Sequence, residues 1–153
     1  MIIPLSLEDT GVVEQIWSLQ HTAYRLEALA VGLTEYPPLP ETFDSIRNSD
    51  ELFYGQLSDD GELIGAIATI TEPVNGELEI TRLMVHSDHL RQGIGTALVQ
   101  YVLDSHAHIT KFVVTAGISN APAVALYKRH GFVPCEVVSY VAGTQLTLFR
   151  LNR

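Results

Sequence analysis

The sequence lacks several features on which membrane, disulfide-bonded and metal-binding proteins depend. Cys135 is the one cysteine in 153 residues, which excludes an internal disulfide and a thiolate cluster. No apolar run approaches the roughly 20 residues that a membrane-spanning helix requires. The segment Met1–Leu5 has neither the basic region nor the small-residue cleavage site of a signal peptide. From these absences we expect a soluble cytoplasmic protein with no membrane partner.

Basic residues are also scarce. Nine Lys and Arg stand against 18 Asp and Glu, which gives a formal net charge of −9. Affinity for nucleic acid comes mainly from Lys and Arg, so a nucleic-acid partner is not expected. An acidic surface favours a cationic partner such as an amine. An anionic ligand would need a local exception, for which the candidates are Arg91, Lys128 and Arg129.

The length fits a single domain over residues 1–153, with 46% hydrophobic residues to fill one core. Periodicity and turn residues predict the following elements: strand 2–5, helices 7–19 and 21–31, loop 36–40, short helix 41–48, strands 52–57, 62–71 and 77–85, a helix from 94, strand 111–115, helix 120–130, and strands 132–140 and 145–151. The predicted fold class is α/β (α+β). It is a mixed, mainly antiparallel twisted sheet of about six to seven strands with about four flanking helices, not a doubly wound parallel sheet.

The most informative segment is a glycine turn between a strand and a helix. Gly93 and Gly95 open the helix, and its unpaired amides with the helix dipole make an anion site suited to a pyrophosphate. A dinucleotide-binding turn would need a third glycine at Leu98, and a P-loop would need Gly-Lys-Ser/Thr. Taken alone, the two glycines favour an ordinary strand-to-helix turn that needs glycine only for its geometry.

Two motifs carry a resemblance to the GNAT superfamily of acetyl-CoA-dependent N-acetyltransferases. The family signature, Gln/Arg-x-x-Gly-x-Gly/Ala after a strand, resembles the two runs Leu83-Met84-Val85-His86 and Arg91-Gln92-Gly93-Ile94-Gly95-Thr96. The first signature position falls at Leu90, and the neighbouring Arg91 would supply the charge that the family places there. The family's Asn-x-x-Ala-x-x-Leu-Tyr-x-x-x-Gly-Phe helix and exit resembles the run from Asn120 to Phe132. The resemblance covers roughly residues 50 to 150.

The resemblance implies an enzyme that moves an acetyl group from acetyl-CoA to a primary amine by direct attack. The implied acetyl-CoA-binding residues are Leu83, Met84, Val85, Arg91, Gln92, Gly93, Ile94, Gly95, Thr96, Asn120 and Tyr127. The signature strand is expected to splay away from strand 111–115, so that pantetheine runs along its freed edge. The main-chain amide of Val85 is then the expected oxyanion donor.

Two side chains are candidates for proton transfer. A phenol with a pKa of about 10 keeps its proton at neutral pH, so Tyr127 suits a general acid for the leaving sulfur. The alternative is that the Tyr127 ring packs beside Val124 and Leu126 on its helix. The resemblance implies Glu79 as the candidate base, because some members of the family carry a catalytic glutamate at this position of the strand, its pKa raised by burial. The alternatives are an exposed strand face without chemistry and a base supplied by water.

The remaining candidates concern the helix start at Asn120 and the acceptor. Asn120 could hydrogen-bond the cofactor, cap the helix, or do both. The resemblance builds the acceptor pocket from the first two helices and the following loop, with Tyr24, Glu27 and Tyr36 as its candidate residues, beside Trp17, His21 and the loop 37–40. These side chains are equally compatible with ordinary core and surface positions.

Other chemistries are not expected. The histidine pairs His86/His89 and His106/His108 lack a matching second pair, so no metal is predicted. Cys135 has no paired base and is not expected to carry an acetyl group. The contrasting functional hypothesis is a non-catalytic acetyl-CoA-binding sensor or interaction module, against which an intact Tyr127 argues. The acceptor amine, the acyl-chain preference and the oligomeric state, a homodimer included, stay open.

Overall fold

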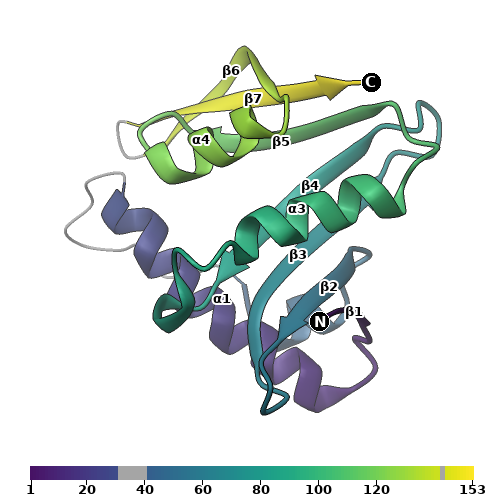
Figure 1. The fold of residues 1–153 in the computed structure, drawn as a ribbon, viewed down its shortest axis with the longest axis vertical. Coiled ribbons are helices and arrows are strands. Elements are labelled where there is room, and N and C mark those ends of the chain that lie inside the picture. The colour runs from purple at the N-terminus through teal and green to yellow at the C-terminus, as the bar shows by residue number, and fades with distance from the viewer. Residues whose placement is uncertain (31–40, 142–143) are drawn as a thin grey trace.

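A seven-stranded sheet in the order β1-β2-β3-β4-β5-β7-β6 is the frame of the protein (Figure 1). The computed structural model describes residues 1–30, 41–141 and 144–153. Its elements are β1 Ile2–Leu5, α1 Thr10–Ala30, α2 Phe43–Arg47, β2 Leu52–Leu57, β3 Leu63–Thr71, β4 Leu78–Val85, the 3₁₀ turn η1 Ser87–His89, α3 Ile94–Ser105, β5 Lys111–Gly117, α4 Ala121–Arg129, β6 Val133–Val141 and β7 Thr144–Asn152. Only β4 and β5 pair in parallel among these strands. The predicted mixed, mainly antiparallel class is confirmed.

The first helix differs from the prediction. One continuous helix, α1, replaces the two helices expected over 7–19 and 21–31. No proline or glycine interrupts the chain between them, and the buried face of Val13, Ile16 and Leu19 continues to Ala23. The helix begins later than expected because the Asp9 carboxylate accepts hydrogen bonds from the first-turn amides, including that of Gly11 at 2.9 Å.

The sheet carries a separate apolar cluster on each face. On one face, α3 packs against β3 through Leu98 and Val102. On the other face, α1 and α2 cover the same strand, with Ile16 and Ile46 fully buried. The helices α1 and α3 therefore have fixed positions relative to β3 and β4, the strands that lead to the glycine turn.

A bulge at Thr81 reverses the side-chain pattern of β4. The register with β3 shifts from Thr69–Ile80 to Ala68–Arg82, so Thr81 is the extra residue. Before the bulge, Ile80 belongs to the cluster on the α3 face, whereas Met84 beyond it belongs to the cluster on the α1 face. The even-numbered residues have changed sides. Arg82 therefore faces α1 and not the apolar cluster under α3.

The strands β4 and β5 separate along their length. Their parallel pairing runs from Leu78–Phe112 to Ile80–Val114 and stops there. Beyond that point β4 continues to Val85 and β5 continues to Gly117, and Figure 1 shows the two strands diverging toward α4. The predicted splay is confirmed. It leaves the last five residues of β4 with an edge that β5 does not pair.

Candidate functional site

A cleft of about 780 Å³ lies where β4 and β5 diverge. Its walls come from α1, the segments before α2 and β2, the end of β3, the bulged half of β4, the beginning of α3, the end of β5 and α4. Segments far apart in the sequence thus meet at the end of the parallel pairing. Crevices at this position in a sheet are common ligand sites.

Many of the predicted site residues meet in this cleft. Those that line it are Tyr24, Leu83, Met84, Val85, Arg91, Gly95, Asn120 and Tyr127. Gln92, Gly93, Ile94 and Thr96 shape the entry to α3 without lining the cleft. Tyr36 and the side chain of Glu27 lie outside the described residues.

Glu79 does not reach the cleft. Its side chain is exposed, contrary to the burial expected of a base, and it does not line the cavity. The neighbouring Glu77 forms an ion pair with Arg150 on β7 at 2.7 Å. The carboxylate of Glu79 therefore faces solvent, and that of Glu77, just before β4, faces β7.

The freed edge of β4 presents main-chain groups to the cleft. The His86 amide donates to the Ile64 carbonyl at 2.8 Å, which makes these two residues a hydrogen-bonded pair across β3 and β4. Hydrogen-bonded and non-hydrogen-bonded pairs alternate in antiparallel sheets, so the next pair, Val85–Gly65, points its amide and carbonyl groups outward. Leu83 lies two residues before Val85, so its amide and carbonyl groups point outward as well. The amides of Leu83 and Val85 thus face the side from which β5 has withdrawn.

The start of α3 has free amides. Gly93, the N-cap residue, has φ of 76° and no side-chain cap hydrogen bond, and the first helical bond runs from the Ala97 amide to the Gly93 carbonyl. The preceding amides have no intrahelical acceptor. A Cβ on Gly95 would lie 3.3 Å from Leu126 of α4, so glycine leaves the space between the two helices open. This geometry suits an anion at the helix dipole.

Tyr127 is both packed and adjacent to the cavity. It is 5% exposed, and its ring centroid lies 5.8 Å from that of Phe132 and 6.4 Å from that of Phe149. It also lines the cleft from α4. The packing interpretation and the catalytic interpretation are therefore compatible, because core contacts fix the ring that borders the cavity.

Asn120 has the predicted capping role. Its side-chain oxygen accepts a hydrogen bond from the Ala123 amide at 3.5 Å, and Pro122 lies in the first turn of α4. Asn120 also lines the cleft. Lys128 and Arg129 lie exposed in the last turn of α4, where cations interact favourably with the helix dipole.

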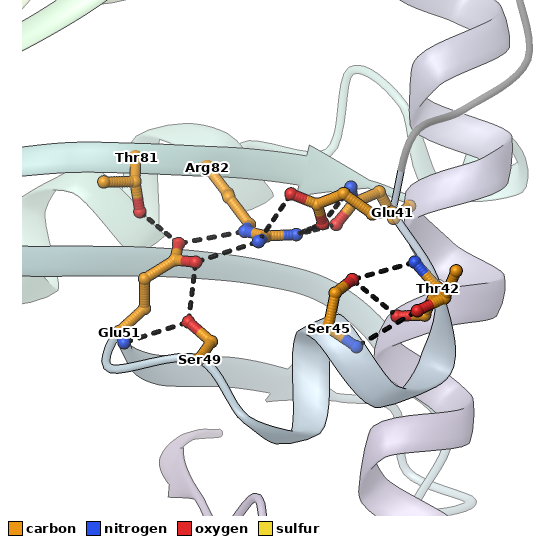
Figure 2. Close-up of polar contacts among 8 residues, drawn as sticks. Glu41, Thr42, Ser45, Ser49, Glu51, Thr81 and Arg82 are labelled. Carbon is orange, nitrogen blue, oxygen red and sulfur yellow. Dashed lines mark hydrogen bonds and ion pairs between the residues drawn. The ribbon is translucent and has the colours of Figure 1, made fainter.

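A cluster of charged and polar residues that was not predicted also lines the cleft. We call Arg82, Glu41, Glu51 and Gln20 the Arg82 cluster; Figure 2 shows the guanidinium between the two carboxylates. The Arg82 Nε and Nη2 donate to Glu51 at 2.9 and 2.8 Å, and Nη2 also donates to Glu41 at 2.8 Å. Nη1 donates to Glu41 and to the Gln20 amide oxygen. All four residues line the cleft.

These contacts determine the charge states within the cluster. Burial alone would raise the pKa of Glu51. Hydrogen bonds from Arg82, Thr81 and Ser49, together with the positive charge of Arg82, outweigh that effect and hold this pKa below its ordinary value. Burial would likewise lower the pKa of Arg82, but its hydrogen bonds to Glu51 and Glu41 and their charges raise it. Glu51 and Arg82 are therefore both ionised at neutral pH.

The sequence does contain a signal for this cluster. Arg82 directly precedes the apolar run Leu83 to Val85 on the same strand, and a charged residue at such a position requires partners for its charge. Its partners come from 31, 41 and 62 positions away in the chain, so spacing alone does not identify them. The bulge at Thr81 also changes which face Arg82 occupies.

The described ranges show how the histidines and the cysteine are placed and whether a helix could span a membrane. Across residues 1–30, 41–141 and 144–153, no three His, Cys, Asp or Glu side chains gather to hold a metal ion. The rings of His86 and His89 lie 5.8 Å apart, and those of His106 and His108 lie 6.3 Å apart. Cys135 is exposed on β6. Among the helices described, none combines the length and apolar character needed to cross a bilayer.

Comparisons with known proteins agree with this geometry. The acetyltransferase (GNAT) family model matches residues 13–132. The UPF0157 protein YqkA of Bacillus subtilis (strain 168) is 36% identical over 151 residues, covering 99% of this chain but 43% of that protein. This chain therefore spans less than half of YqkA. The ribosomal protein bS18-alanine N-acetyltransferase of Escherichia coli (strain K12) is 31% identical over 112 residues, 72% of each chain.

Solved structures share the fold at lower identity. The crystal structure of the S18-alanine N-acetyltransferase from Escherichia coli has a TM-score of 0.75 at 20% identity, covering 99% of this chain and 94% of that one. The NatC complex bound to Gag peptide and CoA contains a chain with a TM-score of 0.75 at 18% identity, with coverages of 100% and 98%. At these identities the likeness concerns the fold.

Proposed function

Because the chain belongs to the GNAT family of acetyltransferases, we propose that it transfers an acetyl group from acetyl-CoA to a primary amine within this cleft. The observation that carries the proposal is the freed edge of β4. It places the outward amide of Val85 in the same cavity as Tyr127 and beside the open start of α3. These are the parts that acetyl transfer from a thioester requires.

The residues present fit the donor that this family uses, acetyl-CoA. The outward main-chain groups of Leu83 and Val85 can pair with the amides of the pantetheine arm, as a β-strand would. The uncapped amides of Gly95 and Thr96 would hold the pyrophosphate at the helix dipole. Arg91 adds a positive charge at the same wall.

The chemistry then needs few side chains. The amine attacks the thioester carbon, so that a C–N bond forms while the C–S bond breaks. The Val85 amide donates to the carbonyl oxygen as charge builds there, a contribution of about 3 kcal/mol for oxyanion donors generally. Tyr127 gives its phenolic proton to the leaving sulfur. Water takes the amine proton in this scheme, because Glu79 is exposed and lies outside the cleft.

The acceptor would enter from the side of α1 and the Arg82 cluster. Tyr24 lines this wall, and we assign it to acceptor binding. Glu27 and Tyr36 stay predictions for the same role.

The test is thiol release from acetyl-CoA against a panel of amines, with Tyr127→Phe beside wild type. We expect turnover with one amine class and a loss of about tenfold or more in kcat for the variant. Tyr101→Phe is the matched control, because Tyr101 is half-buried on α3, packs against Tyr54 and does not line the cleft. Acetyl-CoA binding without turnover of any amine would favour the sensor module instead, and equal activity of the two variants would remove Tyr127 from the mechanism.

A further inference from the structure

We propose that the Arg82 cluster selects acceptors that carry a positive charge. Glu41 is the residue that takes this charge, and Arg82 is the positioning residue that holds Glu41 at the wall of the cleft. The inference rests on the proposed acetyl transfer, because it concerns the acceptor of that reaction. It adds a specificity determinant to a site whose chemistry lies elsewhere, on Val85 and Tyr127.

Arg82 itself is not available to bind an acceptor. A guanidinium has five N–H donors, and all five bonds to the cluster are formed: two to Glu51, two to Glu41 and one to Gln20. The side chain is 12% exposed. An acceptor carboxylate could reach Arg82 only by displacing Glu41 or Glu51. That exchange would leave a partly buried glutamate without its counter-ion, which is unfavourable.

The two glutamates differ in side-chain exposure and in the number of hydrogen bonds that their oxygens accept from the described residues. Glu51 is 9% exposed and accepts four hydrogen bonds, two from Arg82 and one each from Thr81 and Ser49. Two carboxylate oxygens provide about four acceptor positions, so Glu51 is saturated. Glu41 is 30% exposed, and its Oε1 accepts one bond from the described residues, that of Arg82. Among the described residues, Glu41 Oε1 therefore keeps an acceptor position at the cleft wall.

The net charge of the cluster also favours a cationic acceptor. One arginine and two glutamates give the acceptor side of the cleft a net charge of −1. Elsewhere in the same cleft, the amides at the start of α3 and the charge of Arg91 favour anions. A bound donor would thus meet the anion-binding wall, while a cationic nitrogen would meet Glu41. Hydrogen bonds between charged partners are about twice as strong as neutral ones, which makes Glu41 a discriminating contact.

The experiment compares acceptors whose tails are cationic, neutral or anionic. The probes are 1,4-diaminobutane, 1-aminobutane and 4-aminobutanoate, and, as a peptide set, tetrapeptides with N-terminal alanine followed by Lys, Gln or Glu. Wild type is expected to prefer the cationic member of whichever set it acetylates. Glu41→Gln should raise KM for that member by about tenfold, with kcat and the KM for acetyl-CoA within about twofold of wild type. Arg82→Lys should raise the same KM, because a lysine keeps the charge but cannot hold both carboxylates.

Two controls separate this role from general effects. Glu51→Gln removes a negative charge from the other carboxylate that binds Arg82, at the saturated position. We expect it to lower the melting temperature and to raise the acceptor KM by less than Glu41→Gln does. Glu14→Gln removes one charge from the exposed part of α1, outside the cleft, and should leave the acceptor KM unchanged. Equal effects of Glu14→Gln and Glu41→Gln, or a wild-type preference for the anionic member, would overturn the inference while leaving acetyl transfer intact. Absence of turnover with every amine would overturn the proposed function and this inference with it.

Discussion

Replacing Gly65 with alanine is expected to disturb the fold and the donor site together. Gly65 lies on β3 beneath the first turn of α3 and opposite Val85. An added Cβ would lie 2.5 Å from Ile94 Cγ2 and 3.2 Å from Leu98 Cδ1. Carbon atoms pack at about 3.5–4.0 Å, so Ile94 must retreat by about 1 Å or more. Because Ile94 is β-branched and fixed in a helix, a rotamer change cannot provide this space, and the start of α3 must move.

The magnitude follows from the cost of overpacking. Extra methyl groups in a well-packed core typically cost about 1–3 kcal/mol. For a chain of this size each kcal/mol lowers the melting temperature by about 2–4 °C, so we expect a decrease of about 2–12 °C. The KM for acetyl-CoA should rise as well, since the amides at the start of α3 shift.

The matched control is Gly55→Ala on the neighbouring strand β2. There the new Cβ would meet the ends of two leucine side chains, Leu63 at 2.5 Å and Leu5 at 2.9 Å, which can turn aside. Calorimetry and acetyl-CoA kinetics on both variants distinguish the two sites. An unchanged melting temperature for Gly65→Ala, or a rise in acetyl-CoA KM for Gly55→Ala as large as that for Gly65→Ala, would refute the reasoning.

Two further predictions concern stability. Arg153 donates to the carbonyls of Leu103 and His106 at 2.9 and 2.7 Å and to that of Ile109 at 3.0 Å, so it closes the end of α3. Arg153→Ala should lower the free energy of unfolding by about 1–2 kcal/mol in urea titrations, and no change would show these bonds to be dispensable. The lowered pKa of Glu51 predicts a pH dependence: its contribution is complete above the ordinary pKa of a glutamate, about 4.3, and is lost as the pH falls through the lower folded-state value. Urea titrations from pH 7 to pH 3 should therefore show a steeper loss for wild type than for Glu51→Gln, and parallel curves would contradict this assignment.

Much of the architecture was predictable because it depends on local patterns. Alternating strands, the Ser58–Gly61 turn and the change to helical spacing at Ile94 each depend on neighbouring residues. The end of the first helix at 19 was wrong. Without a proline or glycine, the polar pair Gln20–His21 lies on the helix surface and does not interrupt it. Composition alone cannot separate a helix end from a polar face.

The residues along the freed edge of β4 and at α4 were named from the sequence, whereas the Arg82 cluster was not. Leu83, Val85, Asn120 and Tyr127 belong to contiguous motifs, so the sequence indicates them directly. The Arg82 cluster depends on a one-residue bulge and on partners from α1, from the segment before α2 and from the residue before β2. Such contacts are set by tertiary packing, which a single sequence does not reveal.

We propose above that the freed edge of β4 and the start of α3 bind the acetyl donor through main-chain amides. Amide NMR during a titration with CoA tests it directly on the whole chain. We predict the largest shifts at Leu83, Val85, Gly95 and Thr96, with the amides of β1 and β2 unchanged. Saturable binding with shifts confined to other strands, or no binding at all, would contradict the account.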